Sequence, residues 1–155
     1  MKYFRLTKEQ LDELHQEFIH FLASQSITAE EWNDIKQNKP EVAEEELDIF
    51  SDLVWEGVLG RVEYLEHISP QSMHLFHLSE TNMHVIAINI KNEMDLTTSE
   101  GFQWLRDNLM DDAVEFLQAN KTYSEDKNLD KFKLIQQGAV ITKGDLFQFF
   151  NDLVN

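Results

Sequence analysis

Apolar residues recur at intervals of three and four positions through the first part of the chain, a pattern that predicts helices. One helix is expected over about 8–24 and a second, shorter helix over about 29–38. A long central helix is expected over about 40–67, because Pro40 suits the first turn of a helix and the helical pattern continues through this range. The apolar positions of the long helix extend beyond a single stripe, which indicates that other elements enclose it.

Residues typical of helix starts precede four segments of the chain. Each is a Thr followed three residues later by an acid or amide, and the pairs are Thr7 with Gln10, Thr28 with Glu31, Thr97 with Glu100, and Thr142 with Asp145. The helix after Thr97 is expected to run on through Phe116 and Leu117. Ser124 is expected to cap a helix that stops before Gly138, and a last helix is expected over about 143–154.

The apolar pattern changes to a two-residue period between about 72 and 90, which predicts a β-hairpin with its turn at residues 79–82. A two-stranded ribbon alone is marginally stable in water, so further elements must cover it or pair with it. Residues 2–6 and 138–142 are candidates for one or two extra short strands. The predicted fold class is therefore α+β and predominantly helical, with a single domain over residues 1–155.

The chain carries 29 acidic and 13 basic residues, for a formal net charge of −16 at pH 7. This charge argues against binding to nucleic acids or anionic membranes, because both attract clustered Lys and Arg. The chain has no cysteine, which excludes disulfides, thiol nucleophiles and cysteine-ligated metals. The first ten residues are too polar for a secretion signal and no apolar run reaches the ~18 residues of a membrane helix, so we expect a soluble, cytoplasmic protein.

The sequence contains no catalytic motif or cofactor fingerprint, so we expect no cofactor and favour a protein that is not an enzyme. The best candidates for metal ligands are His77 and His84, which the predicted hairpin places opposite each other. His74 falls on the other face of the ribbon, and a third ligand is missing unless Glu80, His67 or a distant carboxylate supplies it. We therefore favour half-buried structural histidines. A metal- or small-ligand-binding protein, with or without enzyme activity, is the alternative function.

Acidic residues concentrate in the predicted long helix. Residues 41–66 contain nine acidic residues and one basic residue, a net charge of −8 that is half of the total. Five acids lie on one helical stripe, and two apolar side chains are expected to emerge beside them: Glu41, Glu45, Asp48, Asp52 and Glu56, with Trp55 and Leu59. Such a surface suits a basic protein partner, since charge speeds association and an aromatic anchor supplies buried area. The alternative is a solvated helix face with Trp55 in the core.

Three stretches of the sequence resemble an uncharacterised protein family of the Bacteroidetes, a domain of unknown function. They are the opening MKYFRLT, then EFIHFLASQSITAEEW, and then DIFSDLVWEGVLGRVEYLEH. The resemblance extends over nearly the whole chain. It implies a bacterial, cytoplasmic setting, and it implies no activity and no site residues.

These observations favour a non-enzymatic regulator or adaptor that acts through protein–protein contact. The acidic helical stripe and the lack of chemical motifs carry this hypothesis. A homodimer with no other partner is a further hypothesis.

Overall fold

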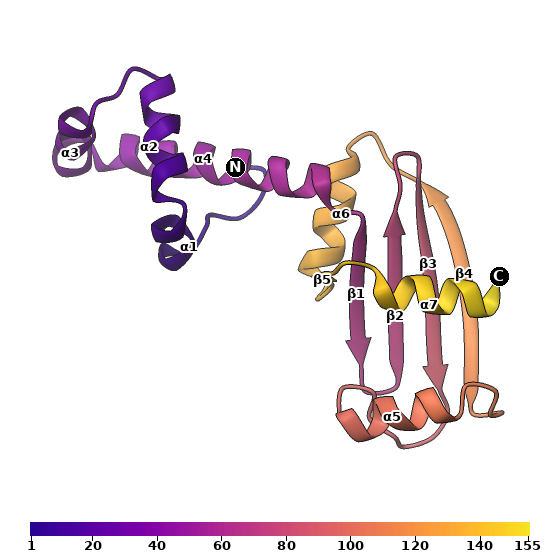
Figure 1. Cartoon of the computed structure of the whole chain (residues 1–155). Helices are drawn as coiled ribbons and strands as arrows, with labels where there is room; N and C mark the ends of the chain where they lie inside the picture. Colours follow the sequence, from indigo (N-terminus) through magenta and orange to yellow (C-terminus); the bar gives the residue numbers. More distant parts are fainter. The chain divides into compact units, whose positions relative to one another are not determined.

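The computed structural model describes residues 1–155, the whole chain, and contains seven helices and one five-stranded antiparallel sheet (Figure 1). The fold class is therefore α+β, as predicted. The chain divides into two compact units, Met1–Gly60 and Arg61–Asn155. The expectation of a single domain over the whole chain stays a prediction.

The first unit is helical. Its helices are α1 (Lys8–Glu13), α2 (His15–Ser24), α3 (Ala29–Asn38) and α4 (Pro40–Arg61). Thr7 and Thr28 cap α1 and α3 as predicted, because each side-chain oxygen accepts a hydrogen bond from the backbone N–H three residues later. The single helix expected over 8–24 is interrupted at Leu14, whose backbone angles (φ −96°, ψ 24°) lie outside the helical region, so α1 ends there and α2 begins.

Aromatic side chains join the helices of the first unit. The ring centroid of Phe50 on α4 lies 5.0 Å from that of Phe18 and 5.4 Å from that of Phe21, both on α2. Phe18 also lies 5.2 Å from Trp32 on α3, in an edge-on contact. Such aromatic pairs contribute about 0.5–1.5 kcal/mol each beyond their buried area. Phe50 is buried and is therefore the centre of this aromatic cluster.

The second unit is built on the antiparallel sheet. Its strands are β1 (Tyr64–Ser69), β2 (Ser72–Leu78), β3 (Asn82–Ile90), β4 (Val114–Thr122) and β5 (Val140–Ile141), in the spatial order β4-β3-β2-β1-β5. The predicted hairpin is confirmed as β2 and β3, with Leu75 opposite Ile86. The strand expected near 138–142 is confirmed as β5, whereas residues 2–6 form no strand.

The long helix predicted over 40–67 is shorter in the structure. α4 ends at Arg61, because residues 64–69 form β1 instead of a last helical turn. Leu65 of β1 pairs with Phe76 of β2 on one side and with Ile141 of β5 on the other. These two rows of backbone hydrogen bonds outweigh the local apolar pattern, which suits a helix.

The helix expected to continue through Phe116 and Leu117 is also shorter. α5 (Ser99–Asp107) ends before them, and both residues belong to β4, which pairs along its whole length with β3. Because side chains alternate along a strand, Phe116 packs near Phe150 while Leu117 points to the opposite face of the sheet. The apolar spacing that predicts a single helix face therefore joins residues of a helix and of a strand.

The later helix starts lie close to the predicted positions, with different capping residues. α5 is capped by Thr98 instead of Thr97, α6 (Lys127–Gln136) by Asp126 instead of Ser124, and α7 (Asp145–Val154) follows Gly144 instead of Thr142. The hydroxyl of Ser124 donates to the carboxylate of Asp130, and the hydroxyl of Thr142 accepts from the N–H of Gly144. Ser124 and Thr142 thus form turns that lead into the helices.

Helix α7 crosses one face of the sheet and α5 lies at the lower end of the strands in Figure 1, and residues of both helices pack into the main hydrophobic core. Its buried residues are Met73, Leu75, Ile86, Ile88, Ile90, Leu96, Leu105, Phe147 and Phe150. On the other face, Leu134 of α6 lies beside Phe76 and Val85 in a hollow of about 240 Å³. The sheet is therefore fully covered on one face only, which is common for antiparallel sheets.

The close approach of α5 to the preceding loop gives a prediction about stability. A Cβ added at Gly101 would collide with the backbone of Asp95. We expect Gly101→Ala to lower the free energy of unfolding by about 1–3 kcal/mol, the usual cost of overpacking, as measured by urea denaturation. Gly60→Ala is the matched control and should cause no loss, because a Cβ there meets no atom within 4 Å. If Gly101→Ala is as stable as the wild type, the close approach of residue 101 to the backbone of Asp95 is contradicted.

Candidate functional site

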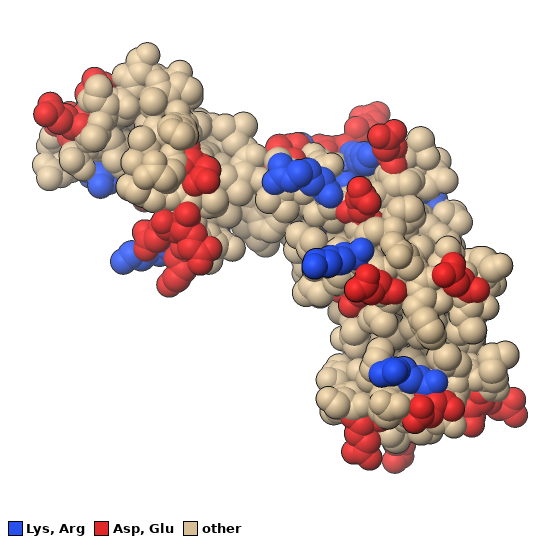
Figure 2. Space-filling view, in the orientation of Figure 1, with Lys and Arg blue, Asp and Glu red and all other residues tan.

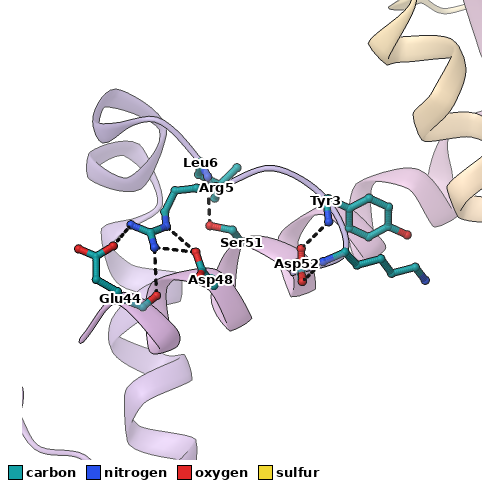
Figure 3. Close-up of polar contacts among 8 residues, drawn as sticks. Tyr3, Arg5, Leu6, Glu44, Asp48, Ser51 and Asp52 are labelled. Atoms are coloured by element: carbon teal, nitrogen blue, oxygen red, sulfur yellow. Dashed lines mark hydrogen bonds and ion pairs between the residues drawn. The ribbon is translucent and has the colours of Figure 1, made fainter. Parts of the chain in front are cut away.

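Residues 2–6, named here the N-terminal segment, lie along α4 (Figure 3). The carboxylate of Asp52 accepts hydrogen bonds from the backbone N–H groups of Lys2, at 2.8 Å, and Tyr3, at 2.9 Å. The hydroxyl oxygen of Ser51 accepts a third, from the N–H of Leu6 at 3.1 Å. The backbone of the N-terminal segment therefore bonds to side chains of α4, which explains why it pairs with no strand.

Arg5 is bound by two acids of α4. Its Nε donates to Oδ1 of Asp48 at 2.6 Å, and its Nη1 lies 2.5 Å from Oε2 of Glu44. Its Nη2 lies 2.6 Å from the same Asp48 oxygen and donates to the backbone carbonyl of Glu44 at 3.2 Å. The hydrogen bonds from Arg5 to Asp48 and Glu44 raise the pKa of the guanidinium, which therefore stays charged.

Glu56 receives the side chains of Lys2 and Tyr3. Its Oε1 lies 2.7 Å from Nζ of Lys2 and also accepts a hydrogen bond from the Tyr3 hydroxyl. Burial, and then the hydrogen bond to Glu56, raise the pKa of Tyr3 to about 12. The indole N–H of Trp55 donates to the carbonyl oxygen of Phe4 at 3.1 Å, and its ring lies 6.3 Å from that of Tyr3. Four consecutive turns of α4 therefore contact the N-terminal segment.

The stripe of acids predicted as a partner-binding surface is partly occupied by the chain itself. We name its five members, Glu41, Glu45, Asp48, Asp52 and Glu56, the acidic strip. The last three bind the N-terminal segment, whereas Glu41 and Glu45 are exposed and their side chains form no hydrogen bond or ion pair. Trp55 lies beside the strip as expected and is half-buried, but Leu59 is buried and presents no surface.

Burial and charge contribute differently to the binding of the N-terminal segment. The paired side chains of Lys2, Arg5, Glu44, Asp48 and Glu56 are between 34% and 61% exposed, so each ion pair contributes at most ~1 kcal/mol. Tyr3 and Leu6 are only 5% and 7% exposed. Burial of an apolar side chain of this size contributes about 1.5–3 kcal/mol. The two buried residues therefore contribute more than the ion pairs, and the charges fix the position along α4.

Sequence reasoning missed the N-terminal segment, Glu44 and Ser51 as parts of this site. One signal was present in the sequence: residues 1–60 carry 14 acidic and five basic residues, and two of the five bases, Lys2 and Arg5, alternate with apolar side chains at the amino terminus. Such a basic stretch next to an acidic helix favours contact between them. The role of Ser51 depends on the bond to Leu6 and had no separate signal.

The hairpin histidines pair as predicted. His77 lies opposite His84, whereas His74 pairs with His67 on the other face of the sheet. The ring of His77 stacks on Tyr64 with centroids 4.8 Å apart, and Nε2 of His84 lies 3.1 Å from the side-chain oxygen of Gln118. No group of three or more His, Asp or Glu side chains is arranged to hold a metal ion. The two histidines are therefore part of an aromatic cluster that covers this end of the sheet.

The first unit contains a groove of about 620 Å³. Leu11, Phe18 and Trp32 are among the apolar side chains that line it, together with Lys8 and Lys36. This lining suits the burial of apolar side chains rather than acid–base chemistry. None of the helices has the length and hydrophobicity needed to cross a membrane.

The model of a family of unknown function, DUF6495, matches residues 1–155. The chain belongs to this family. No curated protein and no solved structure matches the chain. Membership in DUF6495 confirms the resemblance to an uncharacterised family, and the Bacteroidetes origin stays a prediction.

Hydrogen exchange tests the binding of the N-terminal segment to α4. Asp52→Ala removes the acceptor of two backbone N–H groups, and charge-assisted bonds of this kind contribute about 1.5–3 kcal/mol. We expect the amides of residues 2–6 to exchange at least about tenfold faster, as measured by mass spectrometry. Glu45→Ala is the matched control, because it removes a neighbouring acid with no such bond. Equal exchange in the two variants would contradict the described contacts.

Proposed function

We propose that this protein is a non-enzymatic, cytoplasmic regulator or adaptor, and that the acidic strip of α4 receives a basic segment of a protein partner. One observation carries the proposal. The strip already binds a basic segment, because Asp48, Asp52 and Glu56 hold Lys2, Tyr3 and Arg5 of the same chain. The chemistry of this intramolecular contact indicates what a partner would have to offer.

The contacts of the N-terminal segment describe the proposed partner. Asp52 binds backbone N–H groups, which requires an extended segment rather than a helix. Asp48 binds a guanidinium, and Glu56 binds both an ammonium group and a phenol. The partner segment would therefore be extended and would alternate Lys or Arg with aromatic or aliphatic side chains.

Glu41 and Glu45 extend the acidic strip beyond the N-terminal segment. Residues 1–60 have a net charge of −9, and acidic side chains are spread over the face seen in Figure 2. Exposed acids of this kind raise the association rate with a basic protein and make binding sensitive to salt. The ion pairs of the N-terminal segment are weak, but Tyr3 and Leu6 are buried, so a segment that replaces it must bury apolar side chains of its own.

Charge reversal at Glu41 and Glu45 tests the proposal without touching the residues that bind the N-terminal segment. The tagged wild type should capture a basic protein from extracts of its native cells at low salt and lose it at high salt, as identified by mass spectrometry. We expect the variant Glu41→Lys with Glu45→Lys to capture at least about tenfold less, which corresponds to about 1.4 kcal/mol.

The control variant is Glu93→Lys with Asp112→Lys, two exposed residues of the second unit. Both variants change the net charge from −16 to −12, so a difference between them reflects the position of the charges. Equal loss of capture would show that only the total charge matters. Unchanged capture in both variants would contradict the proposal that the acidic strip binds the partner.

The alternative function, metal or small-ligand binding at the hairpin, is supported by the pairing of His77 with His84. The lack of a third nearby ligand weighs against it. We expect protein purified without a His-tag or chelator to contain no stoichiometric metal by elemental analysis. A metal present at one ion per chain, and lost in His77→Ala with His84→Ala, would favour the alternative instead.

A further inference from the structure

The strand β4 forms one edge of the sheet and leaves half of its backbone groups without a partner. The N–H of Lys91 donates to the carbonyl oxygen of Ala113 at 2.8 Å. Together with the β3–β4 register, this bond shows which residues of β4 direct their backbone groups toward β3 and which direct them away. Odd-numbered residues of β4 bond to β3, so the N–H and C=O groups of Phe116, Gln118 and Asn120 point away from the sheet. No residue of the chain hydrogen-bonds to these groups.

The edge formed by β4 has little of the protection that natural sheets use. The strand is nine residues long, contains no proline and pairs with β3 without a bulge. Its last six residues, from Leu117 to Thr122, are exposed. The only charges on it are Glu115 and Lys121, one near each end. A long, exposed edge of this kind is a template for pairing with another strand.

We propose that two copies of the protein associate through β4, paired antiparallel about a two-fold axis at Gln118. This register lets all nine residues of β4 pair with those of the partner copy. The outward backbone groups of Phe116 would then bond to the partner's Asn120, and those of Gln118 to the partner's Gln118. The proposal is independent of the proposed partner site, because β4 and α4 belong to different units.

The side chains of β4 are complementary in this register. Glu115 lies opposite the partner's Lys121, and Lys121 opposite the partner's Glu115, so two opposite-charge pairs flank the axis. Between them, Leu117 lies opposite the partner's Ala119, which covers a leucine that is 49% exposed in the single chain. A shift of two residues in either direction places Glu115 against Ala119 or Leu117 against Lys121 and loses both charge pairs. Cross-strand pairs contribute about 0.2–1 kcal/mol each, so they select the register.

The resulting dimer would have one continuous sheet made of two five-stranded sheets. An interface limited to one strand edge and its side chains lies at the low end of the size of specific interfaces, so we expect a dimer that dissociates in the micromolar range. The side chain of Gln118 also bonds to Asn155 at 2.9 and 3.2 Å, so the carboxyl terminus lies near the axis. The protein for this test should therefore carry no carboxy-terminal tag.

Sedimentation equilibrium over roughly 1–100 µM tests the dimer. Wild type should approach twice the chain mass of 18.3 kDa as concentration rises. Gln118→Pro removes an outward N–H that β3 does not use, so it should raise the dissociation constant at least about tenfold. Gln118→Ala is the matched control, because it loses the same side-chain bonds to Asn155 but keeps the N–H, and it should dimerise as wild type does.

A charge swap provides a second test that does not depend on proline. Glu115→Lys places like charges opposite each other and should weaken the dimer. Adding Lys121→Glu to the same chain restores opposite charges at both positions and should restore the dimer. A mass of one chain at all concentrations, or a dimer unaffected by both Gln118→Pro and Glu115→Lys, would overturn the proposal.

Discussion

The second unit depends on the hydrogen bonds that β3 makes along both of its edges. On one side β3 pairs with β2, its neighbour in the sequence, and on the other with β4, which follows only after α5 and its loops. Ile86 and Ile88 of β3 are fully buried, so β3 also contributes side chains to the hydrophobic core. Loss of the pairing with β4 would expose the backbone of β3 and uncover Phe116 beside Phe150. The sheet and its covering helices therefore stabilise each other.

In the first unit, the N-terminal segment offsets the repulsion between acidic side chains of α4. Asp48, Asp52 and Glu56 follow each other at intervals of four residues along α4, and like charges at this spacing destabilise a helix by about 0.2–0.5 kcal/mol per pair. The N-terminal segment brings the charges of Lys2 and Arg5 to these acids and buries its own Tyr3 and Leu6. The interaction is specific because Asp52 binds backbone N–H groups rather than side chains. The same features make the strip suitable for a segment of similar chemistry from another protein.

The two proposed surfaces use different kinds of recognition. The acidic strip combines exposed charges with a half-buried Trp55, a combination that favours rapid and salt-sensitive association. The edge of β4 offers backbone hydrogen bonds in a fixed register, with Glu115 and Lys121 as the only charges. The first proposed surface would select a partner by its sign of charge. The second would select it by the length and pattern of a strand.

The sequence by itself determined the α+β class, the hairpin, the caps at Thr7 and Thr28, and the acidic face of α4, because each follows from contacts between residues close in the chain. Only the tertiary structure decided that residues 64–69 and 114–122 are strands, since their apolar spacing also suits a helix and long-range pairing makes the choice. The binding of the N-terminal segment to α4 was decided in the same way. Its charges were visible in the sequence, but the bonds from the backbone to Asp52 exist only once residues about fifty positions apart meet.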